Sequence, residues 1–97
     1  MSTLGTVSIT KHGPAAVIHY VEAGGSHDFD AELGGGKVLL TIYAPPDDGE
    51  WERRLPWAAG RRTEVLEHIA RRVARRESPG SKVVVHALGV DILATRW

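Results

Sequence analysis

Arginine is the residue type in this chain with the clearest capacity for chemistry. It outnumbers lysine nine to three, and six arginines fall within residues 61–76. These six are Arg61, Arg62, Arg71, Arg72, Arg75 and Arg76. A guanidinium is planar and always charged, and it binds a carboxylate or a phosphate through two parallel N–H donors. The cluster therefore predicts a surface that binds an anionic partner.

Two simpler explanations of these arginines stay open. An exposed helix face in a small domain carries charged residues for solubility alone. The last four arginines also fall near the end of a predicted helix, where the macrodipole favours positive charge by about 0.3 to 1 kcal/mol each. The sequence alone does not separate a binding surface from a solvated one.

A short segment before that helix, residues 51–57, interleaves two tryptophans with two arginines. They are Trp51, Arg53, Arg54 and Trp57. Aromatic rings alternating with cations can stack on a base or a peptide, and both residue types are enriched at the centres of interfaces. We expect either an aromatic lid or interface at this segment, or two tryptophans packed as apolar cover over the edge of a sheet.

A further group of residues could line a ligand cavity between sheet and helix. His19 and His86 lie within apolar stretches, as do Tyr20 and Tyr43. A lone histidine in a strand is more commonly a hydrogen-bonded core or rim residue. The chain has no cysteine, its serines lie in no nucleophile motif, and its five histidines lack the spacing of a metal helix. No catalytic residue, metal site or cofactor is therefore predicted.

Acidic residues are segregated from the arginines along the chain. Residues 1–50 hold seven acids and two bases, a net charge of −5, and residues 51–97 hold five acids and ten bases, a net charge of +5. Asp28, Asp30 and Glu32 alternate along one predicted strand and share one face. They form a solvated face or a protected edge, or they meet the helix arginines within the chain or across a dimer.

Hydrophobic periodicity predicts the elements that position these residues. Residues 15–23 and 37–44 are apolar on both alternating faces, which indicates central strands. Residues 27–33 alternate strictly, which indicates a strand with one exposed face, and residues 5–10 form a strand before them. Residues 61–77 have helical spacing, and residues 83–87 and 90–95 form a closing hairpin.

This order predicts an α+β fold with a mainly antiparallel sheet of five or six strands. A four-strand N-terminal meander and a C-terminal hairpin build the sheet, and a single helix near residues 61–77 packs on one face. A helix about 10 Å wide covers only about two strands. Because two strands are apolar on both faces, the other face must meet the segment 51–57, a second copy of the chain, or a ligand.

Length and composition fit a single domain, residues 1–97, with 42% hydrophobic and 25% charged residues. The lack of cysteine, of a targeting segment and of a membrane-length apolar run makes a cytoplasmic location the default, without a membrane partner. The net charge is zero, so the chain lacks the global positive potential usual in nucleic-acid-binding domains.

These observations favour a non-enzymatic protein-interaction module. We expect it to form a homodimer through its second sheet face and to turn the arginine-rich helix toward an acidic protein or another anionic partner. A small-ligand-binding protein or minor enzyme with a cavity between sheet and helix is the first alternative. A nucleic-acid-binding domain is the second, and it is not favoured.

Overall fold

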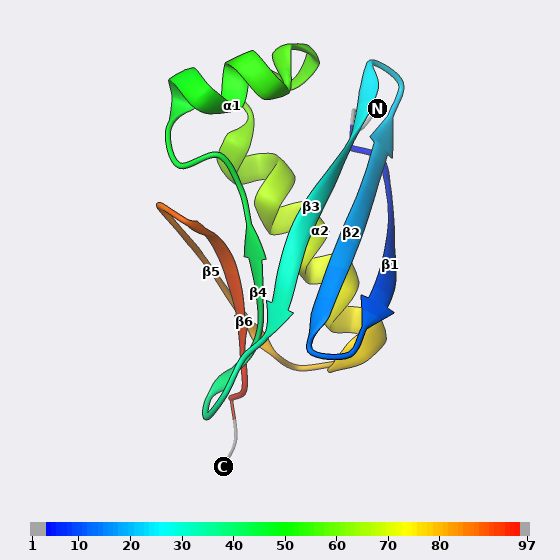
Figure 1. The fold of residues 1–97 in the computed structure, drawn as a ribbon, viewed down its shortest axis with the longest axis vertical. Helices are drawn as coiled ribbons and strands as arrows, with labels where there is room; N and C mark the ends of the chain where they lie inside the picture. Colours follow the sequence, from blue (N-terminus) through cyan, green and yellow to red (C-terminus); the bar gives the residue numbers. More distant parts are fainter. Residues whose placement is uncertain (1–3, 96–97) are drawn as a thin grey trace.

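A computed structural model describes residues 4–95 and shows one antiparallel sheet of six strands (Figure 1). The strands are β1 (Thr6–His12), β2 (Ala15–Glu22), β3 (Gly25–Leu33), β4 (Val38–Tyr43), β5 (Lys82–His86) and β6 (Gly89–Leu93). Their order across the sheet is β1-β2-β3-β4-β6-β5. The α+β class, the N-terminal meander and the C-terminal hairpin are confirmed.

Strand pairing is extensive at both sides of the sheet and short in its middle. β2 and β3 pair along their whole lengths, whereas β3 and β4 pair only from Ala31 to Leu33 on the β3 side. β4 then pairs with β6, with a register irregularity between Val38 and Leu40. The two strands predicted to be central, β2 and β4, each have a neighbour on both sides.

Three helical segments follow β4. Asp47 caps α1 (Asp48–Arg54) by accepting a hydrogen bond from the amide of Glu50 at 2.8 Å. A short 3-10 turn, η1 (Pro56–Ala58), leads to the main helix α2 (Arg62–Glu77). The predicted main helix is confirmed, and α1 is a second helix between β4 and the main helix.

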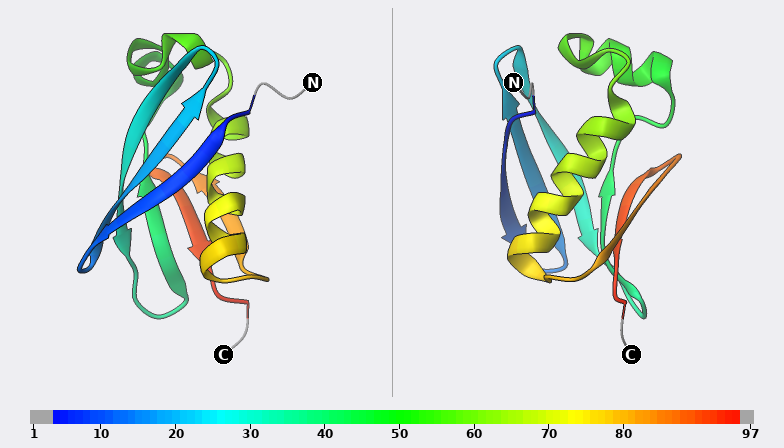
Figure 2. Two further views of the ribbon diagram at one scale, coloured as in Figure 1. Left: turned by 90° about the vertical axis from the view of Figure 1, so that its right-hand side faces the viewer. Right: turned by 180° about the vertical axis from the view of Figure 1, so that it is seen from behind.

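The apolar stripe of α2 packs against the concave side of the sheet. Its fully or nearly buried residues are Val65, Leu66, Ile69, Ala70, Val73 and Ala74. Figure 2 shows the sheet curled around the helix, and α2 contacts β1 at one edge and β5 and β6 at the other. The expectation that one helix covers only two strands is wrong, because it assumed a flat sheet and this sheet is strongly curved.

The face of the sheet turned away from α2, here called the outer face, is not covered by the segment between β4 and α2. Trp51 of α1 stacks on Phe29, whose side chain is buried on the α2 side. The segment 51–57 therefore closes one end of the same core (Figure 2). The expectation that the segment 51–57 covers the outer face is therefore wrong. The two other expected covers, a second copy of the chain and a ligand, remain open.

The start of β6 imposes a strict steric requirement on one glycine. Gly89 has φ of +145°, and a Cβ there would lie 1.9 Å from the carbonyl oxygen of Ile42. We expect Gly89→Ala to lower the free energy of unfolding by about 1 to 3 kcal/mol, measured by urea denaturation. Gly35→Ala is the control, because a Cβ at Gly35 meets open space. Equal losses in the two variants would contradict this account.

Candidate functional site

Four of the six predicted arginines form one exposed surface on the last turns of α2. We call Arg71, Arg72, Arg75 and Arg76 the arginine surface; all four are exposed. Arg71 pairs with Glu67 at 3.3 Å, one helical turn away. Within residues 4–95, Arg72, Arg75 and Arg76 make no ion pair or side-chain hydrogen bond. The surface thus presents guanidinium donors that the described chain does not use.

The other two predicted arginines act inside the protein. Arg61 pairs with the buried carboxylate of Glu22 and donates to the carbonyl of Trp57 at 3.2 Å. Arg62 donates to the backbone carbonyls of Pro45, His86 and Ala87 at 2.8 to 3.0 Å. The predicted anion-binding set is corrected to four residues, because the donors of Arg61 and Arg62 hold the fold together.

Arg61 belongs to a polar network at the end of β2. The hydroxyl of Tyr20 donates to Glu22 and accepts from the amide of Gly5 at 3.0 Å. The ring of His68 meets the carbonyl of Gly5 at 2.8 Å. Tyr20 is therefore a core residue with a satisfied hydroxyl, and the prediction that it lines a ligand cavity is wrong.

Burial and hydrogen bonding set the ionisation of this network. Burial and, after it, the hydrogen bond to the carboxylate of Glu22 raise the pKa of Tyr20 to about 12. Burial also raises the pKa of Glu22, but the hydrogen bonds from Arg61 and Tyr20 together outweigh burial, so the pKa of Glu22 lies below its ordinary value. Near neutral pH, Glu22 is ionised and Tyr20 is protonated.

The tryptophans of the segment 51–57 pack, and they do not form a lid. Trp51 is 1% exposed, donates from Nε1 to the carbonyl of Ala58 at 2.8 Å, and stacks on Phe29. Trp57 stacks on Tyr20 with 6.2 Å between ring centroids. The exposed Arg53 and Arg54 both pair with Glu50. Packing, the second of the two expectations, is what the structure shows for both tryptophans.

His19 lies in a polar row across the outer face. Its Nε2 is 2.8 Å from the hydroxyl of Thr10 on β1, and its Nδ1 is 2.8 Å from Asp28 on β3. The order hydroxyl, imidazole, carboxylate matches a nucleophile triad. The row lies on the exposed outer face and links side chains of three neighbouring strands, β1, β2 and β3.

His86 forms a second, separate cluster on the outer face. Its Nδ1 accepts from the amide of Leu88 at 3.2 Å, and its buried Nε2 lies 3.0 Å from Asp91 without making a hydrogen bond in the described chain. Asp91 also accepts from Thr41 at 2.7 Å. His19 is on β2 and His86 is on β5, and alternation along both strands turns these side chains away from α2. The prediction that they share a cavity between sheet and helix is therefore wrong.

Two of the hollows in the described chain lie away from His19 and His86. An apolar cavity of about 300 Å³ opens between the sheet and the C-terminal half of α2. A wider hollow of about 570 Å³ lies beside α1, where β3 and β4 separate, and includes Tyr43, Arg54 and Asp28. Tyr43 is the one predicted cavity residue found at a hollow, but it is on the outer face. His27 also lines this hollow, and burial lowers its pKa.

Acidic residues of β3 do not reach the arginine surface. Asp28, Asp30 and Glu32 are exposed on the outer face, with the sheet between them and α2. Within residues 4–95 no three histidine, aspartate or glutamate side chains converge as a metal site would require. The same residues contain no helix long and apolar enough to cross a membrane.

No family model, curated protein or solved structure matches this chain.

The Glu22 and Arg61 pair generates a pH-dependent prediction. Glu22→Gln is expected to lower the free energy of unfolding by about 1 to 3 kcal/mol near neutral pH, because it weakens charged hydrogen bonds to a buried group. A carboxyl group with a lowered pKa stabilises the fold above its unfolded-state pKa of about 4.3, and this contribution is lost as pH falls through the folded-state value. The difference between wild type and variant should therefore shrink between about pH 7 and pH 3 in urea titrations.

Glu64 provides the matched control for that experiment. It is the second acidic partner of Arg61, at 3.6 Å, and its side chain is 53% exposed. Glu64→Gln should cost less than about 0.5 kcal/mol, as an exposed pair does. A Glu22→Gln deficit that stays constant over the whole pH range would contradict the lowered pKa.

Proposed function

We propose that this protein is a non-enzymatic interaction module whose arginine surface binds an acidic segment of a partner protein. The observation that carries the proposal is the position of the charges. The acids of β3 lie on the outer face, so they do not neutralise Arg72, Arg75 and Arg76 across the sheet. Three guanidinium groups without an internal ion pair on neighbouring helix turns suit the bidentate binding of carboxylates.

The helix α2, which carries the arginine surface, is held in place by core packing and by hydrogen bonds at its first turn. Its opposite side is buried in the core from Val65 to Ala74. Arg62 ties its first turn to the carbonyls of Pro45 and His86. Binding therefore costs little ordering of the backbone, and only the arginine side chains lose freedom.

An acidic protein fits this surface better than a nucleic acid. The four arginines span residues 71–76, about 9 Å of helix at 1.5 Å per residue. Four cations give a slope of log affinity against log salt of only about −3.6 on duplex DNA. The net charge of zero also provides no global positive potential of the kind usual in nucleic-acid-binding domains.

The experiment replaces Arg71, Arg72, Arg75 and Arg76 with glutamine and measures binding to poly-L-glutamate at low and moderate ionic strength. Wild type should bind, with affinity decreasing as salt increases, and the variant should lose about tenfold or more because the bidentate contacts are gone. Fluorescence anisotropy of a labelled polymer gives the affinity.

The matched control replaces four exposed cations outside the surface, Lys37, Arg53, Arg54 and Lys82, with glutamine. It makes the same change of net charge, so equal loss in the two variants would show a general charge effect and contradict a defined site. Tighter binding of wild type to duplex DNA than to poly-L-glutamate would contradict the acidic-protein partner.

We also propose that a second copy of the chain covers the outer face. Val21, Tyr43 and Val84 are each exposed by 37 to 50% on that face. Burying these residues against a second copy of the chain favours association of a domain this small. Both copies would bring the β3 acids to the interface, so this contact should strengthen with salt, the opposite of the arginine surface.

Light scattering after size-exclusion chromatography tests the dimer. A Val21→Ser and Val84→Ser double variant should shift the protein toward monomer, because it removes apolar area from the outer face. Leu33→Ser with Leu88→Ser is the control, since both leucines are exposed but lie off that face. A strict monomer at high concentration and high salt would rule out the second copy.

A further inference from the structure

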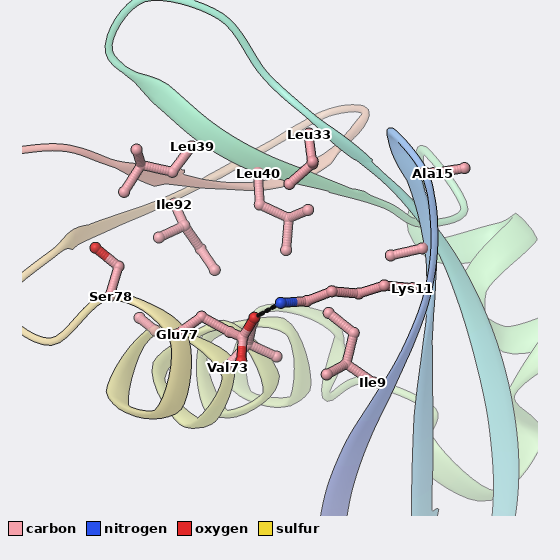
Figure 3. Close-up of a pocket in the computed structure, with 13 residues that line it drawn as sticks. Ile9, Lys11, Ala15, Leu33, Leu39, Leu40, Val73, Glu77, Ser78 and Ile92 are labelled. Atoms are coloured by element: carbon pink, nitrogen blue, oxygen red, sulfur yellow. Dashed lines mark ion pairs between the residues drawn. The ribbon is translucent and has the colours of Figure 1, made fainter.

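An apolar cavity lies at the C-terminal half of α2. Figure 3 shows it between α2, the turn that joins β1 to β2, and the strands β4 and β6. Its volume is about 300 Å³. Its large apolar lining residues are Ile9, Leu33, Leu39, Leu40, Val73 and Ile92.

Local backbone and side-chain features keep this cavity open. The register irregularity of β4 lets the consecutive residues Leu39 and Leu40 line the same hollow, although alternation would place them on opposite faces. Ala16 on β2 and Ala74 on α2 also line it, and their side chains are too small to fill it. The cavity is thus a consequence of particular residues and not of loose packing in general.

One ion pair spans the cavity. Lys11 on β1 reaches across to Glu77 at the end of α2, as Figure 3 shows. Their side chains are 55% and 32% exposed, so the pair is in contact with water and contributes little to stability. Lys11 and Glu77 are the only ionisable residues among those that line the cavity. An apolar interior therefore has one cation and one anion beside it.

The size of the cavity limits its occupant. Its volume equals that of about ten water molecules in the liquid, at about 30 Å³ each. This is the lower end of the range for small-molecule sites. The interior therefore takes an apolar group the size of a leucine or phenylalanine side chain.

We propose that this cavity binds a free apolar α-amino acid. The side chain enters the cavity, the carboxylate of the ligand pairs with Lys11, and its ammonium group pairs with Glu77. The C-terminal end of α2 adds partial negative charge on the side of Glu77, which also favours the ammonium group there. This site is separate from the arginine surface and does not depend on it.

Charge pairing distinguishes a zwitterion from other amphiphiles. A ligand with only a carboxylate would draw Lys11 away and leave Glu77 unpaired beside the helix end. A ligand with only an amine would leave Lys11 unpaired. With a zwitterion, Lys11 pairs with the carboxylate of the ligand and Glu77 pairs with its ammonium group. Every charge then has an opposite charge beside it, and the net charge of the site stays at zero.

The test is a methyl NMR titration of the whole chain with L-phenylalanine and two analogues. Phenylpropionate lacks the ammonium group, and phenethylamine lacks the carboxylate. L-Phenylalanine should shift the methyl signals of Ile9, Val73 and Ile92, and each analogue should bind about fivefold more weakly, the upper range for one exposed ion pair.

Two variants assign the charges. Lys11→Met should bind L-phenylalanine no better than phenethylamine, and Glu77→Gln should bind it no better than phenylpropionate. Lys37→Met and Glu32→Gln, which change exposed charges away from the cavity, should keep the wild-type preference. The proposal is overturned if either analogue binds wild type as tightly as L-phenylalanine, or if the titration leaves the three methyl signals unchanged.

Discussion

The burial of the α2 stripe in a curled sheet is the constraint on which the rest of the structure depends. Val65, Ile69 and Val73 are nearly or fully buried, and both edge strands contact the helix. Because the buried stripe of α2 faces the sheet, the opposite side of the helix faces solvent. The exposed arginines lie on that side, so the packing of the core decides in which direction the positive charge faces.

The same constraint explains the outer face. Alternation along β2 and β3 places Tyr20 and Phe29 in the core and therefore His19 and Asp28 on the opposite side. Two histidine and aspartate pairs then form on that side, one on each half of the sheet. The outer face therefore combines these polar pairs with exposed apolar residues such as Val21 and Val84.

Periodicity predicted the elements of the fold well, since a strand or helix exposes its apolar period directly in the sequence. Asp28, Asp30 and Glu32 share a face as expected, and the main helix covers the predicted residues. Strand register and sheet curvature were not predictable, because they depend on pairing between distant residues. The contacts of Arg61 with Glu22 and of His19 with Thr10 follow from register, so the candidate site was only partly predicted.

The charges of this molecule are separated in space as well as along the chain. The outer face has the β3 acids, and the far side of α2 has the arginines, with the sheet and core between them. A molecule of zero net charge arranged in this way has a permanent electric dipole directed between the outer face and the far side of α2. Near a charged surface this dipole experiences a torque. It therefore rotates to present one face before contact, so encounters begin already oriented.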